Sequence, residues 1–210
     1  KALSAALQMA EVFPHIDFRR EVTIGHLMLD IGARAGVLAK VNPPIRPRED
    51  VEFLWEKLLD GKVDWVVSGH ACCRHETKAA KKTFGNIWLA KSGFGGTEYL
   101  LPALVSEGTK RGLPLNRIAA LTSLNPAQRY GLNAKGDIAE GLDADLALVD
   151  PRETWTVRAG DSQSTQGYTP FEGIELSARV KATFLRGQLV CENGNVLGRP
   201  RGEYLRRPTA

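Results

Sequence analysis

The 210 residues include 43% hydrophobic side chains, enough to bury a core in one large domain or two small ones. The formal charge of +4 results from 28 basic and 24 acidic residues that are mostly interspersed, which argues against a nucleic-acid-binding face. No apolar run approaches the roughly 20 residues of a membrane-spanning helix, and three cysteines with an adjacent pair favour a reducing, cytoplasmic setting over a disulfide framework.

The first half of the chain has the pattern of an α/β protein. Apolar residues at helical spacing predict a helix over Ala2–Val12, and a short strand is expected at Arg20–Thr23, before a loop that carries His26. Glu49–Gly61 has apolar residues along one helical face and ends in glycine, as a surface helix does. The nearly all-apolar Asp64–Ser68 then predicts a buried strand. This order of elements predicts parallel α/β packing.

Loops and helices follow this strand. A polar, lysine-rich loop is expected over Arg74–Asn86, with Lys78–Lys82 in solvent. The glycine loop Gly93–Gly96 lacks the lysine and hydroxyl of a phosphate-binding loop, so that signal is weak. The next helix is predicted to end at Gly112, with Pro102 in its first turn because proline disrupts a helix interior.

The character of the sequence changes near residue 131. Before it, two short helices are predicted, the second opened by Asn125 as N-cap and Pro126 at the first helical position. After it, short alternating strands are separated by glycines, with a hairpin turn predicted at Glu192–Gly194. We therefore expect an α/β body over residues 1–131 and a small antiparallel β unit over 132–210.

Six segments carry a resemblance through their order along nearly the whole chain. They are Lys40–Asp50 (KVNPPIRPRED), Val63–Lys78 (VDWVVSGHACCRHETK), Ser92–Gly108 (SGFGGTEYLLPALVSEG), the helix start at Asn125 (NPAQRYGL), Gly136–Asp150 (GDIAEGLDADLALVD) and Tyr168–Val190. In this order they resemble the carboxyl-terminal half of the cyclic amidohydrolases, which include dihydroorotase, allantoinase and hydantoinase. Each segment alone is a weak signal, whereas their succession is specific.

This resemblance implies an α/β fold class, the carboxyl-terminal part of a (β/α)8 TIM-type barrel with a small β-sandwich subdomain. It also implies one or two zinc ions at the carboxyl ends of the barrel strands, a small cyclic amide or ureide substrate, and a homo-oligomer. The metal ligands are expected mainly from the amino-terminal half of the barrel. We expect that half as a partner, covalent or cleaved, because two barrel strands cannot close a barrel.

Gly69 stands where the resemblance places a metal-binding aspartate. In the family, that aspartate ligates a metal and takes the proton from the water that attacks the ring carbonyl. Glycine performs neither task, and three explanations stay open. Gly69 is a laboratory substitution, it marks a naturally silent homologue, or His70 or Cys72 takes over as a metal ligand. The plainer interpretation of these two residues is that His70 packs behind the strand and Cys72 is a small buried hydrophobe.

Four further residues are candidates for substrate contact. Asn42 is expected beside the substrate ring, where its amide can donate and accept hydrogen bonds, and the backbone around Ala71 is expected to orient the ring. Cys73 occupies a position at which related dihydroorotases carry a histidine that grips the substrate carboxylate, so a neutral cyclic ureide or imide is favoured. Gly95 belongs to the Gly93–Gly96 loop, which the resemblance suggests is a mobile lid.

The combined prediction is metal-dependent hydrolysis of a cyclic amide, of the dihydroorotase, hydantoinase or allantoinase type, impaired at Gly69. The alternative is a catalytically silent amidohydrolase homologue that acts as a scaffold or assembly partner. Restoring a carboxylate at position 69 is the natural test to distinguish the hydrolase from the silent homologue.

Overall fold

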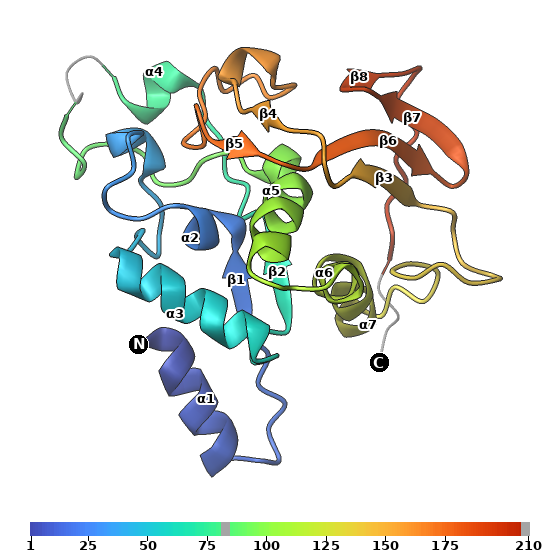
Figure 1. Ribbon diagram of the computed structural model, residues 1–210, viewed down its shortest axis with the longest axis horizontal. Coiled ribbons are helices and arrows are strands. Elements are labelled where there is room, and N and C mark those ends of the chain that lie inside the picture. Colours follow the sequence, from blue (N-terminus) through green and yellow to red (C-terminus); the bar gives the residue numbers. More distant parts are fainter. Residues whose placement is uncertain (81–84, 207–210) are drawn as a thin grey trace. The chain divides into compact units, whose positions relative to one another are not determined.

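The computed structural model describes residues 1–80 and 85–206 (Figure 1). These residues form two compact units, each made of two stretches of the chain. Within the described residues, the first lies inside Lys1–Leu100 and Arg158–Glu172, and the second inside Leu101–Val157 and 173–206. The division into residues 1–131 and 132–210 stays a prediction about the domains of the protein.

The first unit contains a parallel pair of strands joined through helices, as the sequence predicted. After helix α1 (Ala2–Val12), strand β1 (Glu21–Thr23) pairs in parallel with β2 (Trp65–Val67), with Val22 opposite Val66. Both strands have buried apolar side chains. Parallel pairing requires a long crossover connection, and helices supply it here.

The crossover consists of helix α2 (Ile24–Met28), a 3-10 turn and helix α3 (Arg48–Leu59). The loop expected around His26 is therefore wrong, because the Thr23 side chain accepts a hydrogen bond from the His26 amide and caps a short helix. Helix α3 buries a stripe consisting of Val51, Trp55 and Leu58, as expected for a surface helix.

The Trp55 indole explains how this helix is attached. Its Nε1–H donates a 2.8 Å hydrogen bond to the carbonyl of Leu27, at the carboxyl side of β1. A buried indole N–H needs such a partner, since an unsatisfied donor is costly in an apolar core.

The segment predicted as a solvated lysine loop is partly helical and partly buried. His75–Lys78 form the short helix α4, and the Lys78 side chain is fully buried. The expectation of a solvated Lys78 is thus wrong, because its Nζ donates to two backbone carbonyls, which compensate for lost hydration. The rest of that cluster, 81–82, lies outside the described residues.

The Gly93–Gly96 loop is buried against the chain that leaves β2. Phe94 forms an isolated parallel bridge with His70, and the Ala71 amide donates to the Phe94 carbonyl at 3.1 Å. A Cβ at Gly93 would lie 2.5 Å from the Ala71 oxygen, and one at Gly96 would lie 2.8 Å from the Ser68 oxygen. The glycines therefore permit two backbones to approach each other.

Helix α5 (Thr97–Lys110) follows the loop and contains Pro102 as its sixth residue, one turn later than predicted. Helix α6 (Leu115–Ala119) continues through a π-helical turn into α7 (Asn125–Tyr130). Asn125 is consequently not an N-cap, because the residue before it is already helical and the expected break between the two helices is absent.

The second unit carries the predicted antiparallel strands. A four-stranded sheet has the order β3 (Leu146–Asp150), β6 (Arg179–Leu185), β7 (Gln188–Glu192) and β8 (Asn195–Val196). A separate antiparallel pair consists of β4 (Trp155–Thr156) and β5 (Glu175–Leu176).

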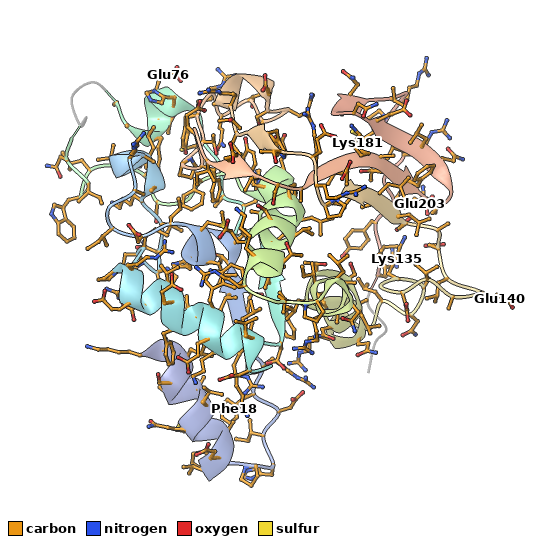
Figure 2. All side chains as sticks on the ribbon, in the orientation of Figure 1. Phe18, Glu76, Lys135, Glu140, Lys181 and Glu203 are labelled. Carbon is orange, nitrogen blue, oxygen red and sulfur yellow. The ribbon has the colours of Figure 1, made fainter. Side chains whose placement is uncertain are left out.

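Turn chemistry explains one success and one error in this unit. The predicted turn joins β7 to β8, with Asn193 at φ 47° and Gly194 at φ 81°, the left-handed pair that a tight hairpin requires. Alternating strands were expected throughout the segment after residue 131, but in Gly136–Asp150 only the last five residues form a strand. Lys135 (Figure 2) instead pairs with Asp143 and Asp145, which holds the preceding segment in turns.

The Gly93 contact gives a stability prediction. Gly93→Ala combines a φ of +96° with the clash against Ala71, and we expect a loss of about 2–4 kcal/mol in the free energy of unfolding of the full-length protein. Gly112→Ala is the matched control, because Gly112 has φ +84° and open space around its Cβ position, and its cost is about 1–2 kcal/mol. Urea titrations that give both variants the same loss would refute the close contact.

Candidate active site

The candidate residues lie where the two parallel strands end. Thr23 and Val67 are paired as the last residues of β1 and β2, and Gly69 follows two residues after β2. The carboxyl ends of parallel strands are where α/β folds place their ligand sites. The loops that carry Asn42 and Gly95 also belong to this unit.

Gly69 is exposed and has a left-handed backbone, with φ +61°. A Cβ at this position would lie 3.0 Å from Cγ2 of Thr23 and 3.3 Å from its Cβ. The Thr23 side chain is not free to turn away, because its hydroxyl is 2.6 Å from Nδ1 of His26. An aspartate at position 69 would therefore require both a strained φ and a shift of Thr23.

His26 connects Thr23 to the loop of Asn42. Its Nε2 lies 3.0 Å from the Pro43 carbonyl, which only accepts, so Nε2 carries the proton and Nδ1 accepts from the Thr23 hydroxyl. Burial lowers the pKa of His26, in agreement with a neutral ring. Both ring nitrogens are engaged, so His26 holds Thr23 and the Asn42 loop in place.

The interpretation that His70 packs behind the strand is wrong, because its side chain lies beside Gly96 and Thr97 at the start of α5. The residue is exposed, and its Nδ1 lies 3.3 Å and 3.4 Å from the amide nitrogens of Gly96 and Thr97 and 2.9 Å from the Thr97 hydroxyl. The amide groups only donate, so Nδ1 is the acceptor and a neutral ring carries its proton on Nε2. The ring thus accepts hydrogen bonds from the amides of Gly96 and Thr97 at the start of α5. In this tautomer, neither ring nitrogen has a free lone pair for a metal ion.

Cys72 is exposed and Cys73 is half-buried, and all three cysteines of the chain are free thiols. The interpretation of Cys72 as a buried hydrophobe is thus wrong, because the residue is exposed to solvent. Among the described residues, no group of three or more His, Cys, Asp or Glu side chains is arranged to hold a metal ion. The metal candidates His70 and Cys72 remain a prediction.

The expected substrate-binding residues differ in accessibility. Asn42 is exposed and precedes a cis peptide bond to Pro43. The Ala71 amide is used by Phe94, and the buried Gly95 amide donates to Oε1 of Gln166 at 2.9 Å. Asn42 therefore presents its side chain to solvent, whereas the amides of Ala71 and Gly95 hold the loop in place.

Lys78 is the polar side chain that sequence reasoning missed. Its Nζ donates to the carbonyls of Lys40 and Gly93, both at 2.6 Å. Burial lowers the pKa of Lys78 to about 8, and the nearby Cys73 opposes this shift. The available signal was the apolar Ala79-Ala80 pair directly after it, which is atypical of a solvated lysine run.

Tyr168 is another buried side chain near Cys73. Its ring packs edge-on against His75, with centroids 5.9 Å apart, and its hydroxyl is buried without a hydrogen-bond partner among the described residues. Burial is the main cause that raises the pKa of Tyr168, and Cys73 adds to it. This phenol therefore stays protonated and gives Cys73 a neutral, partly apolar wall.

A surface pocket lies beside these residues and not at Gly69. Its volume is about 530 Å³, and its lining consists of Arg74, His75, Glu76 (labelled in Figure 2), Thr165, Gln166 and Gly167. The lining residues come from the start of α4 and from the 165–167 loop. We place the candidate site at the strand ends and not in this pocket, because the strand ends bring together the residues singled out by the sequence.

Sequence comparisons identify relatives of this chain. The family described as "Amidohydrolase family" matches residues 94–190. The chain is 45% identical over 174 residues to an allantoinase of Rubrobacter xylanophilus, covering 82% of this chain and 37% of that protein. It is 38% identical over 193 residues to a dihydroorotase of Methanosarcina mazei, covering 90% of this chain and 41% of that protein.

Solved structures give the same result for the fold. An L-hydantoinase (dihydropyrimidinase) of Arthrobacter aurescens matches with a TM-score of 0.85 and 29% identity, over 93% of this chain and 44% of that one. A D-hydantoinase of a Thermus species matches with a TM-score of 0.84 and 30% identity, over 94% of this chain and 44% of that one.

The class that fold and sequence define is the amidohydrolases. Within that class, the chain belongs with the cyclic amidohydrolases, as its motif order predicted, and its fold is that of a partial α/β barrel. The chain spans less than half the length of the relatives described above. None of the helices in the described ranges has the length and apolar character to cross a membrane.

Lys78 gives a pH prediction whose sign follows from its lowered pKa. Between about pH 8 and the unfolded value near 10.5, the unfolded chain binds more protons at this residue than the folded chain. The free energy of unfolding therefore rises with pH in this window, by up to about 1.4 kcal/mol per unit from Lys78.

The measurement is a comparison of the full-length protein with its Lys78→Met variant in urea titrations from about pH 7 to about pH 10. The stability difference should be constant below about pH 8 and shift in favour of the wild type above it. A difference that is flat across the whole range would show that Lys78 titrates normally.

Proposed function

We propose that the protein to which these residues belong opens the ring of a small cyclic amide by hydrolysis. The observation that carries the proposal is the combined match, in sequence and in fold, to enzymes named allantoinase, dihydroorotase and hydantoinase. The loops at the carboxyl ends of β1 and β2 support it, since they gather the residues that the family resemblance singled out. The proposed setting is cytoplasmic, and the proposed assembly is a homo-oligomer that includes the amino-terminal half of the barrel.

The contribution of this chain is the binding and orientation of the ring. The exposed Asn42 amide can donate to a ring carbonyl and accept from a ring N–H at the same time. The Gly93–Gly96 loop forms a fixed backbone wall, because it is buried and bonded to Ala71. We therefore propose a preformed wall at this side of the site in place of a mobile lid.

The proposed substrate is a neutral ring of the hydantoin type, such as a cyclic ureide. Cys73 is half-buried and lies near the buried Tyr168 phenol, an environment suited to an uncharged group. The 45% identity to an allantoinase, against 38% to a dihydroorotase, points in the same direction. The buried Lys78 does not reverse this preference, because its Nζ bonds are directed to backbone carbonyls.

Zinc, as one or two ions, is the proposed cofactor, but the described residues do not fit a metal site on their own. Gly69 has no side chain, and Nδ1 of His70 faces the first amides of α5. We therefore propose that the ligands come mainly from other parts of the protein. These residues would contribute the surroundings of the ion and not its coordination.

A silent homologue that serves as a scaffold is the second candidate function. The observation that favours it is specific, since Gly69 lacks the carboxylate and its left-handed backbone beside Thr23 hinders a replacement. The two functions make opposite predictions for the full-length wild-type protein. The first predicts ring opening, and the second predicts none with any ring.

The first test is an assay of the purified full-length protein with hydantoin, its 5-ureido derivative and dihydroorotate, following the loss of ring absorbance and the acid product. We expect turnover of the neutral rings and a kcat/KM for dihydroorotate that is at least about tenfold lower, because Cys73 cannot form the charged pair with a carboxylate. Equal turnover of all three rings would contradict the assignment of Cys73. No turnover of any ring would favour the scaffold.

The second test restores the carboxylate with allowance for its surroundings. Gly69→Asp is combined with Thr23→Ser, which removes the methyl group 3.0 Å from the new Cβ and keeps the hydroxyl bonded to His26. A carboxylate that functions as general base should raise kcat roughly 100-fold or more over the Thr23→Ser single variant.

The matched control for this test is Gly69→Asn with Thr23→Ser, which has the shape of aspartate without its charge. Gly69→Asp alone should be less stable than the double variant by about 1 kcal/mol or more. If the Asp and Asn variants have the same kcat, Gly69 does not occupy the position of a catalytic carboxylate.

A further inference from the structure

The Lys78 ammonium joins three loops of the candidate site. It belongs to α4, within the loop that follows Gly69, and it donates to Lys40, two residues before Asn42, and to Gly93, two residues before Gly95. The Gly93 amide also donates to the Lys40 carbonyl at 3.0 Å. One buried side chain thus fixes the two segments that carry the proposed ring contacts.

We propose that Lys78 is a positioning residue, which holds the Asn42 loop and the Gly93–Gly96 loop at the separation that ring binding requires. This inference rests on the proposed hydrolase function, because it assigns Lys78 to the substrate site of that reaction. Both hydrogen bonds of the Lys78 Nζ go to backbone carbonyls, so Lys78 acts through these loops and takes no part in the chemistry.

The number of hydrogen bonds supports a positioning role over a purely electrostatic one. Two of the three ammonium N–H groups are used, and a neutral amine still has two donors. Loss of the charge therefore leaves the tie between the loops intact, whereas loss of the amine breaks both bonds at once. A buried carbonyl without its donor is costly, so the two loops would move to find other partners.

The experiment compares Lys78→Met, which removes both donors at similar length, with Lys78→Gln, which keeps a neutral N–H donor. Lys62→Met is the control, because Lys62 is exposed at the turn before β2. In the full-length protein we expect Lys78→Met to raise KM for the ring roughly 10- to 100-fold with a much smaller change in kcat. Lys78→Gln should recover part of this loss, and Lys62→Met should match the wild type.

Amide hydrogen exchange tests, without any substrate, whether the two hydrogen bonds of Lys78 hold the loops together. The Gly93 and Ala71 amides should lose at least about tenfold in protection in Lys78→Met, and the amides of α3 should be unchanged. If the wild type hydrolyses no ring, the proposed function fails, and this exchange result still decides whether Lys78 ties the loops.

Several outcomes would overturn the positioning role. Unchanged KM and unchanged protection in Lys78→Met would show that the two hydrogen bonds position nothing. A lower kcat with the KM of the wild type, or the failure of both Lys78 variants to fold, would show that Lys78 supports the fold as a whole. Equal losses in the Met and Gln variants would assign the effect to the charge and not to the hydrogen bonds.

Discussion

The close approach of two backbones, Gly93–Gly96 against Ser68–Ala71, is the constraint on which the candidate site depends. Side chains at Gly93 and Gly96 would occupy the space of main-chain oxygens, so glycine is needed on one side of the contact. The hydrogen bond between Ala71 and Phe94 and the two bonds of Lys78 then fix the loops around it. The Ala71 and Gly93 amides donate hydrogen bonds to the Phe94 and Lys40 carbonyls and are therefore not available to a substrate.

The sequence predicted the elements whose signals are local. The helix at Ala2–Val12, the parallel strands and the Asn193–Gly194 turn follow from periodicity and from residue types that few conformations accept. The predictions from sequence failed where a side chain bonds to a residue that is distant along the chain. The burial of Lys78 depends on the carbonyl of Lys40, 38 residues away, and composition alone does not show such a partner.

In the candidate site, too, some features were predictable from the sequence and others were not. The family resemblance selected Gly69 and Asn42, and the structure places both in exposed positions of one unit. The roles of Thr23 and His26 were not predictable, because they arise from where the two strands end and from a hydrogen bond to the Pro43 carbonyl. Their effect is to fill and fix the space that a larger residue at position 69 would enter.

The packing of Thr23 against Gly69 also limits the order in which substitutions at this site can be acquired. An aspartate that arises first meets a methyl group held by the hydroxyl bond to His26, and its cost falls on stability before any carboxylate function is gained. A serine that arises first at position 23 removes one methyl group and keeps the hydrogen bond. The two changes are therefore epistatic, and the path that begins at residue 23 is the more accessible one for a lineage that gains or regains the carboxylate.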